Sequence, residues 1–134
     1  MSRANLDLVN GVYAAFAQGD VPGVLEAMHP EIIWNEAENF PYADRNPYIG
    51  PQAVLEGVFM RLGTEWNDWT LDVEEVLASG DQVVARGRYN ATHGTTGKPI
   101  SAQFVHVWWV KDHKLSRFQQ YADTAQVLRA MDSM

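Results

Sequence analysis

The period of the hydrophobic pattern changes near the middle of the chain, and this change limits the folds that the sequence can adopt. From Thr70 onward, four β-type runs follow one another with turn signals between them. These runs cover residues 71–77, 82–93, 100–111 and 114–122. Four consecutive strands joined by short turns favour an antiparallel meander, which we expect to form the larger part of a curved sheet.

Helical spacing dominates the part of the chain before this meander. Residues 2–18 carry apolar side chains on one helical face, and residues 20–28 are expected to form a short second helix with Asp20 as its N-cap. A third helix is expected over residues 51–63, and a last one, after the meander, over residues 123–131. The chain therefore opens with an αα-hairpin and closes with a helix.

One further strand and a long loop separate the second and third helices. The strand is expected over residues 31–37, which contain a β-type run at residues 32–34. Residues 38–51 hold three prolines, which favour an irregular loop. Tyr42 and Tyr48 lie on this loop, where we expect them to form the rim of a cavity.

Helices first and strands afterwards are typical of the α+β class. We predict a single domain over residues 1–134, in which a curved antiparallel sheet forms a cone around the N-terminal helices. Both faces of the strand expected over residues 100–111 are apolar or aromatic: Phe104, His106, Trp108 and Val110 lie on one, and Val105, Val107 and Trp109 on the other. We expect one face to pack on the helices and the other to contact a second copy in a homodimer.

Composition excludes several classes of partner. Seventeen acidic residues against ten basic ones give a net charge of −7, which would repel a nucleic-acid backbone. The absence of cysteine excludes disulfides and thiolate metal sites, and it fits a reducing, cytoplasmic compartment. No apolar run approaches the ~18 residues of a membrane span, so we expect no membrane contact.

The sequence also offers no pattern for a metal or a cofactor. His29, His93 and His113 show no paired spacing of the kind that metal ligands adopt. The glycine-containing segment 93–98 joins two expected strands and does not open a helix, unlike a phosphate-binding loop. We therefore expect neither a metal site nor a cofactor.

The order of these elements resembles the nuclear-transport-factor-2-like superfamily, and within it the SnoaL-like polyketide cyclase and ketosteroid isomerase branch. The resemblance covers the whole chain and is carried by Gly19-Asp20, His29-Pro30, the strand 32–36, the segment 48–54 and Lys114-Leu115. It implies a curved sheet around a deep apolar pocket. The superfamily hosts isomerases, cyclases and plain binding modules, so the function depends on the site.

The resemblance implies catalytic roles for Glu36 and His106. Glu36 matches the catalytic carboxylate of the isomerases, and His106 matches a protonated acid that donates a hydrogen bond to the enolate oxygen. Beside Trp34 in an apolar cavity, Glu36 would have a raised pKa, whereas at a frayed strand end it would be solvated. His106 is either a pocket donor or a core histidine bonded to a neighbouring acceptor.

Two other positions of the family pattern differ in this chain. The isomerase tyrosine aligns with Val12 and not with Tyr13, and Gln119-Gln120 replaces the Trp-Asp pair of the cyclases. We assign Gln120 to ligand orientation, because an amide donates and accepts hydrogen bonds but takes no proton at neutral pH. The other candidates for lining the pocket are Tyr13, Phe16, Trp34, Trp108 and Phe118.

The sequence thus predicts a cofactor-free enzyme of the isomerase or cyclase type that acts on an apolar, carbonyl-bearing small molecule. Glu36 would abstract a proton next to the carbonyl, His106 would hydrogen-bond the developing oxyanion, and Gln120 would fix the pose. The alternative is a non-catalytic module that binds an apolar ligand or mediates association. Whether Glu36 and His106 face one cavity separates the two.

Overall fold

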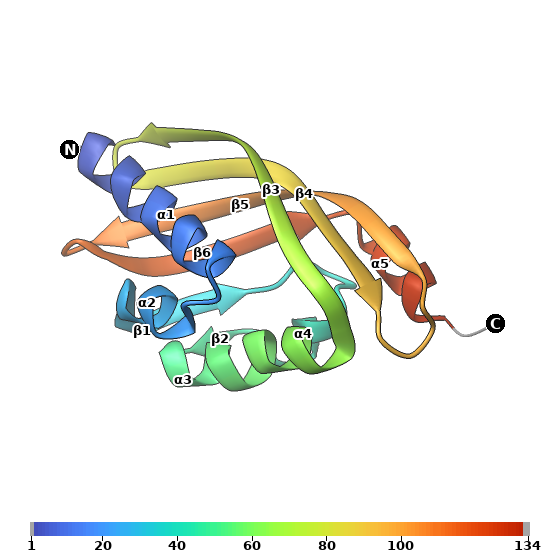
Figure 1. Cartoon of the computed structure of the whole chain (residues 1–134). Coiled ribbons are helices and arrows are strands. Elements are labelled where there is room, and N and C mark those ends of the chain that lie inside the picture. Colours follow the sequence, from blue (N-terminus) through green and yellow to red (C-terminus); the bar gives the residue numbers. More distant parts are fainter. Residues whose placement is uncertain (1, 133–134) are drawn as a thin grey trace.

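The computed structural model of the chain describes residues 2–132 (Figure 1). Its first part contains α1 (Ser2–Ala17), α2 (Val21–Glu26), β1 (Met28–Asn35), the 3₁₀ helix η1 (Pro41–Arg45) and β2 (Tyr48–Ile49). A helical segment follows, made of α3 (Pro51–Val54), the π-helical turn η2 (Leu55–Phe59) and α4 (Met60–Glu65). The last part contains β3 (Trp66–Ser79), β4 (Gln82–His93), β5 (Pro99–Lys111), β6 (Lys114–Ala122) and α5 (Thr124–Met131). The predicted α+β order is confirmed.

Six strands form one sheet in the order β2-β1-β6-β5-β4-β3. The strands β3 to β6 pair antiparallel with their neighbours in sequence, which confirms the predicted meander. β1 differs, because it lies parallel to β6 while β2 pairs antiparallel with its other side. A parallel pair needs a long connection, and here that connection contains the helical segment and the first strands of the meander. The sheet is therefore mixed and not wholly antiparallel.

β3 bends as it crosses the helices (Figure 1). Its register with β4 shifts twice, within residues 67–70 and within residues 73–75, and such bulges bend a strand. Gly87 of β4 lies at the second shift, where an added Cβ atom would be 2.1 Å from the carbonyl oxygen of Asp72. Only glycine permits this close approach of two backbones. The bend wraps the sheet around α1 as the predicted cone requires.

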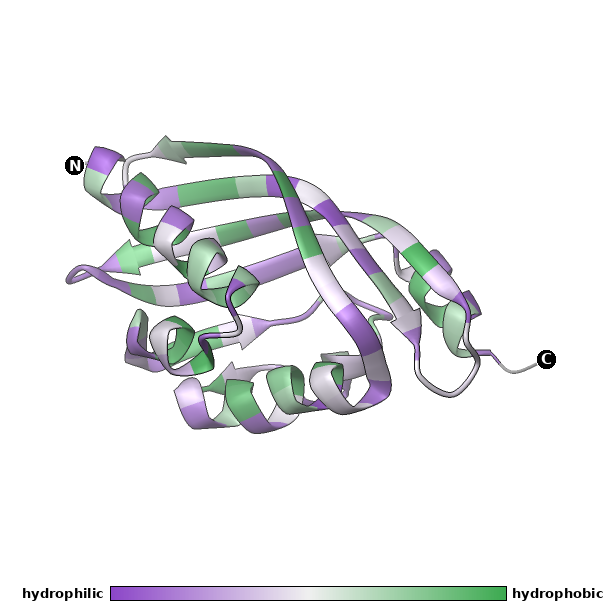
Figure 2. Cartoon of the chain, viewed as in Figure 1, coloured by the Kyte–Doolittle hydropathy of each residue, from purple (hydrophilic) through white to green (hydrophobic). Residues whose placement is uncertain are grey.

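The helices cover the concave face of the sheet and enclose the core (Figure 2). On β4 and β5, buried and more exposed residues alternate, so each strand has one inward face. His106 points inward with its neighbours Phe104 and Trp108, as the sequence predicts. Val105 and Val107 lie on the outer face and are half-buried.

The predicted loop over residues 38–51 is more ordered than its prolines suggest, since it contains η1 and β2. The prediction that Tyr42 and Tyr48 form a rim is wrong, because both side chains are buried. The Tyr42 hydroxyl donates to Glu65 at 2.7 Å and accepts a hydrogen bond from Trp66 Nε1 at 3.2 Å. The Tyr48 hydroxyl donates to the Tyr42 carbonyl oxygen at 2.5 Å. We call Tyr42, Tyr48, Glu65 and Trp66 the Tyr42 network; it ties the loop to the helical segment.

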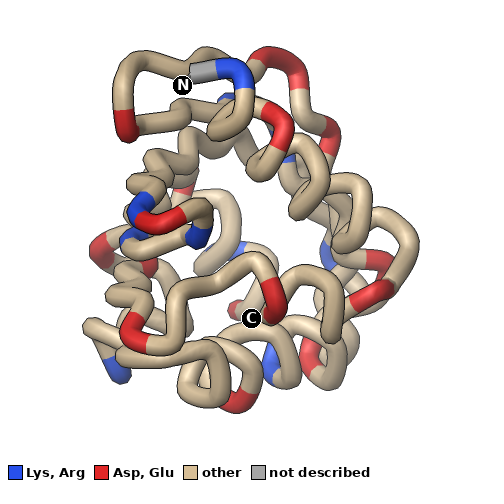
Figure 3. The backbone as a smooth tube through the Cα atoms, turned by 90° about the vertical axis from the view of Figure 1, so that its left-hand side faces the viewer, with Lys and Arg blue, Asp and Glu red and all other residues tan. Residues whose placement is uncertain are grey.

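Acidic and basic residues are interspersed along the backbone (Figure 3). Arg86 contacts Glu74 at 3.0 Å and Glu75 at 2.9 Å on the sheet surface. No helix within residues 2–132 has both the length and the apolar character that crossing a membrane would take. In the same part of the chain, no three His, Asp or Glu side chains lie together in a way that could hold a metal ion.

Candidate active site

The cone encloses a narrow apolar cavity of about 50 Å³, which is room for a few water molecules. Five strands, α1, α2 and the helical segment contribute to its wall. It is lined by all eight residues that the sequence analysis assigns to the site: Tyr13, Phe16, Trp34, Glu36, His106, Trp108, Phe118 and Gln120. A ligand larger than a few waters requires aromatic side chains of the wall to move.

Glu36 follows the last residue of β1, and its backbone is held on both sides by one asparagine. The Glu36 N–H donates to Asn46 Oδ1, and Asn46 Nδ2 donates to the Glu36 carbonyl oxygen, each at 2.9 Å. The Glu36 residue is only 3% exposed. Of the two environments considered for Glu36, the structure therefore shows the buried one and not a solvated strand end.

The two carboxylate oxygens of Glu36 have different surroundings. Oε2 accepts a hydrogen bond from Trp34 Nε1 at 2.9 Å, while Oε1 is buried and has no hydrogen-bond partner among the described residues. Burial raises the pKa of Glu36 from 4.5 to about 7, against the opposing effects of the Trp34 hydrogen bond and the Arg61 charge. Near neutral pH the carboxyl group therefore populates both forms, which suits a general base.

His106 is buried between two tyrosine hydroxyls. Its Nδ1 atom lies 2.7 Å from the Tyr13 hydroxyl, and its Nε2 atom lies 2.5 Å from the Tyr89 hydroxyl. Burial lowers the pKa of His106 to about 3, so the ring is neutral at neutral pH. The expected direct donation from His106 to a ligand needs revision, because both ring nitrogens already have partners. The ring can reach a ligand only through one of the hydroxyls.

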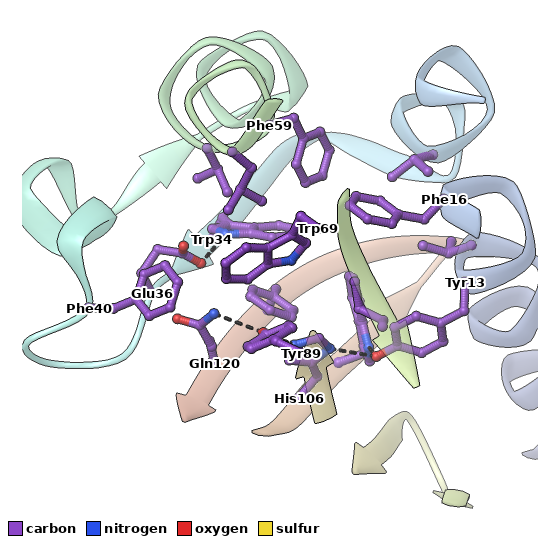
Figure 4. A pocket seen from close by; sticks show the side chains of 17 residues that line it. Tyr13, Phe16, Trp34, Glu36, Phe40, Phe59, Trp69, Tyr89, His106 and Gln120 are labelled. Atoms are coloured by element: carbon purple, nitrogen blue, oxygen red, sulfur yellow. Dashed lines mark hydrogen bonds between the residues drawn. The ribbon is translucent and has the colours of Figure 1, made fainter. Parts of the chain in front are cut away.

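Two further side chains extend this arrangement at either end, and Figure 4 shows one of them, Gln120, beside Tyr89. Trp108 Nε1 donates to the Tyr13 hydroxyl at 2.9 Å, and Gln120 Nε2 donates to the Tyr89 hydroxyl at 2.9 Å. We call Tyr13, Tyr89, His106, Trp108 and Gln120 the His106 network. Gln120 also accepts a hydrogen bond from the backbone N–H of the residue after Glu36, at 3.0 Å. The network thus ends next to the buried carboxylate.

The sequence matches the SnoaL-like domain over residues 9–118. The chain belongs to the SnoaL-like domain family. Its fold is that of NTF2-like proteins: a solved NTF2-like protein from Burkholderia thailandensis is 34% identical, with a TM-score of 0.92 over 96% of this chain and 97% of that one. The structure of TerC co-crystallised with polyporic acid is 26% identical, with a TM-score of 0.85 over 96% of this chain and 98% of that one.

A curated relative of this SnoaL-like domain is patulin synthesis protein F from Aspergillus clavatus. The two sequences are 31% identical over 85 residues, which make up 63% of this chain and 42% of that protein. The matched segment therefore spans less than half the length of the relative.

Several residues that line the cavity of this SnoaL-like domain were not predicted from the sequence to do so. Tyr89, Phe40 and Trp69 also line the cavity. The alternation of β4 places Tyr89 on the inner face with Val83, but alternation alone does not distinguish a residue that lines a cavity from one in the solid core. The two hydrogen bonds between the Asn46 side chain and the Glu36 backbone could not be predicted from the local sequence, because they depend on how the loop folds back.

One part of the cavity wall also faces outward. Tyr13, Phe16, Trp69 and Leu71 line both the inner cavity and a second hollow of about 130 Å³ between α1 and β3. All four side chains are half-buried. Because the same four side chains line both spaces, they separate the inner cavity from the outer hollow.

Proposed function

We propose that this SnoaL-like domain is a cofactor-independent enzyme of the isomerase or cyclase type that acts on an apolar, carbonyl-bearing small molecule. The observation that carries the proposal is Glu36 Oε1, a buried carboxylate oxygen at the wall of an apolar cavity that has no hydrogen-bond partner in the part of the chain that the structure describes. Buried polar atoms are normally hydrogen-bonded, and an exception points to a ligand or a reaction. The raised pKa of Glu36 places its ionisation close to neutral pH.

In the proposed reaction, ionised Glu36 removes a proton from a carbon next to the substrate carbonyl. Oε1 takes the proton, because Oε2 is held by the Trp34 indole. The electron pair of the broken C–H bond moves to the carbonyl oxygen and forms an enolate. An isomerase returns the proton from Glu36 to another carbon. A cyclase instead joins the enolate carbon to an electrophilic carbonyl of the same molecule, whose oxygen then receives the proton.

The surroundings of Glu36 support charge development on a substrate oxygen. The His106 network supplies hydroxyl groups at the cavity wall, and the apolar walls around it strengthen any hydrogen bond to an oxyanion. Gln120 is held at both ends of its amide and would help to fix the pose of the substrate. A relative co-crystallised with polyporic acid and another named for patulin synthesis fit a small organic substrate.

Exchange of acidic hydrogens in D₂O tests the proposal. We suggest 2-tetralone, a flat apolar ketone with acidic hydrogens next to its carbonyl, with exchange followed by NMR. The rate should rise with pH through about 7 as Glu36 ionises. Glu36→Gln should lower it by ~10²- to 10⁴-fold, the usual contribution of one positioned base. Binding of the ketone without exchange above the buffer rate would favour the binding-module alternative.

We also propose a homodimer through the outer face of the sheet. Val84 pairs with Val107 in the sheet register, and Val105 pairs with Tyr121, so apolar side chains adjoin across three strands. Tyr121 is 56% exposed. Light scattering should give the mass of a dimer for the wild type and of a monomer for Val107→Glu. Met60→Glu, on α4 and away from this face, is the control and should remain dimeric.

A further inference from the structure

The His106 network contains more hydrogens that can be donated than hydrogen bonds that use them. Trp108 donates an N–H to the Tyr13 hydroxyl, and Gln120 donates an N–H to the Tyr89 hydroxyl. The direction of these two hydrogen bonds is fixed, because neither nitrogen can accept a hydrogen bond. The indole nitrogen is only a donor. The Gln120 amide is oriented by its other end, since Oε1 accepts the backbone N–H of Ala37. Both tyrosine oxygens therefore already accept one hydrogen bond.

The two remaining bonds, which join the tyrosines to His106, need two hydrogens, but three are present. A neutral imidazole supplies one N–H, and Tyr13 and Tyr89 supply one O–H each. Whichever tautomer the ring adopts, one tyrosine donates to it and the other accepts from it. The accepting tyrosine keeps its own hydrogen, for which the hydrogen bonds of residues 2–132 show no acceptor. A protonated ring would leave both tyrosine hydrogens without one.

The position of Glu36 distinguishes the two tyrosines. The Tyr89 hydroxyl is linked through Gln120 to Ala37, the residue after Glu36. Burial raises the pKa of Tyr89, and the charge of Glu36 contributes to the same shift. Tyr13 is bonded to Trp108 and His106, and it lies on the side of the cavity away from Glu36 (Figure 4). A carbonyl oxygen and the adjacent acidic carbon are only two bonds apart, so the donor has to lie on the Glu36 side.

We propose that Tyr89 donates the hydrogen bond to the substrate carbonyl oxygen and that His106 is a positioning residue that leaves the Tyr89 hydrogen free for this purpose. The proposal deepens the proposed function and rests on it. The required tautomer carries its hydrogen on Nε2, so that His106 donates to Tyr89 and Tyr13 donates to Nδ1.

In this state every donor in the row points the same way. Trp108 donates to Tyr13, Tyr13 to His106, His106 to Tyr89, and Tyr89 to the substrate. Hydrogen bonds in such a row polarise one another. With Gln120 as a second donor, the Tyr89 oxygen accepts two hydrogen bonds, which makes its own O–H a stronger donor to an enolate. The ligand class is therefore a ketone or related carbonyl compound with an acidic hydrogen next to the carbonyl.

Nitrogen-15 NMR of the His106 ring tests the tautomer in the full chain without any ligand. Nε2 should carry the hydrogen and Nδ1 should not, in the wild type and in Tyr13→Phe. A hydrogen on Nδ1 alone, or on both nitrogens, overturns the proposal. In Tyr89→Phe the preference for Nε2 should be lost, because Nδ1–H can then donate to Tyr13 while Nε2 has no partner.

Variants then test the donor with 2-tetralone labelled with ¹³C at the carbonyl. Tyr89→Phe should lower the exchange rate by ~10²- to 10³-fold, the usual loss for one oxyanion donor, and should return the carbonyl stretch of the bound ketone towards its value in apolar solvent. Tyr13→Phe should leave the stretch unchanged and lower the rate less. The opposite ranking of the two variants overturns the proposal.

His106 variants separate positioning from packing. An amide can donate to one tyrosine and accept from the other, so His106→Gln should keep more exchange activity than the apolar His106→Leu. If His106→Gln and His106→Leu unfold at the same temperature and lose exchange activity equally, His106 is not a positioning residue. If the wild type neither binds nor exchanges the ketone, the proposed function fails, and the NMR measurement still decides whether the Tyr89 hydrogen is the free one.

Discussion

Two groups of buried tyrosine hydroxyls lie in this SnoaL-like domain, and they differ in whether all their hydrogens are used. In the Tyr42 network, each hydroxyl hydrogen has an acceptor: Tyr42 donates to Glu65, and Tyr48 donates to a backbone carbonyl. In the His106 network, one tyrosine hydrogen has no acceptor within residues 2–132, and the neighbouring Glu36 Oε1 has no hydrogen-bond partner there either. The first network is closed within the chain, while the second is open to a ligand.

Under the proposed function, this difference separates a structural role from a functional one. A buried polar group without a partner costs about 1–3 kcal/mol of stability, so an open network is a disadvantage to folding alone. The Tyr42 network carries no such cost, and Arg61 adds to it by lying 4.4 Å from the centre of the Tyr42 ring. Aromatic content therefore does not identify the site in this chain. The proposed site is marked instead by a hydroxyl hydrogen and a carboxylate oxygen that lack hydrogen-bond partners among the described residues.

The largest expected contrast is between two Glu→Gln substitutions, at Glu36 beside the His106 network and at Glu65 in the Tyr42 network. Glu36→Gln should reduce ketone exchange by ~10²- to 10⁴-fold without loss of stability, because the amide needs no ionisation in the cavity. Glu65→Gln should leave exchange unchanged and lower the free energy of unfolding by about 1 kcal/mol, because a charged acceptor of Tyr42 is lost. Exchange by NMR and urea unfolding measure both. Equal exchange rates in the two variants would contradict the comparison.

The next effect is the pH dependence of stability. The folded state binds the Glu36 proton more tightly than the unfolded chain, with a pKa of about 7 against 4.5, so stability falls as pH rises through this range. The shift corresponds to roughly 3 kcal/mol. Glu36→Gln removes this dependence of stability on pH. The lowered pKa of His106 produces the opposite dependence, but it does so in both the wild type and the variant and therefore cancels in their difference. Unfolding free energies from pH 4 to 8 should therefore converge at the acidic end. Parallel curves would argue against a raised pKa.

A smaller effect is expected at the closed network. Tyr42→Phe leaves the buried Trp66 N–H without its acceptor, so the free energy of unfolding should fall by about 1–3 kcal/mol. Ketone exchange at a temperature well below unfolding should not change. A fall in exchange without a fall in stability would show that the two networks are not separate.

The smallest effect tests an electrostatic link between the two regions. Arg61 pairs with Asp44 at 2.9 Å, and its charge lowers the pKa of Glu36. Arg61→Gln should shift the pH midpoint of exchange upward and reduce stability by less than about 1 kcal/mol, since the pair is partly exposed. Arg3→Gln, at an exposed helical pair with Asp7, is the matched control and should leave the midpoint in place.

The sequence by itself determined most of the elements and the inward faces of β4 and β5. Period and turn chemistry are local properties, so the α+β order, the Asp20 cap and the meander could be predicted, and alternation placed His106 inside. Glu36 was reached through family resemblance, and its burial is a matter of the fold.

Only the tertiary structure decided which polar atoms meet. β1 lies parallel to β6, which brings Gln120 to the residue after Glu36, and the curvature of the sheet brings Tyr13 and Tyr89 to opposite sides of one imidazole. Tyr42 and Tyr48 turned inward because partners for their hydroxyls lay in the helical segment and in the loop itself. Side-chain hydrogen bonds depend on positions within a few tenths of an ångström, set by contacts between residues far apart in sequence, and a local pattern carries no record of them.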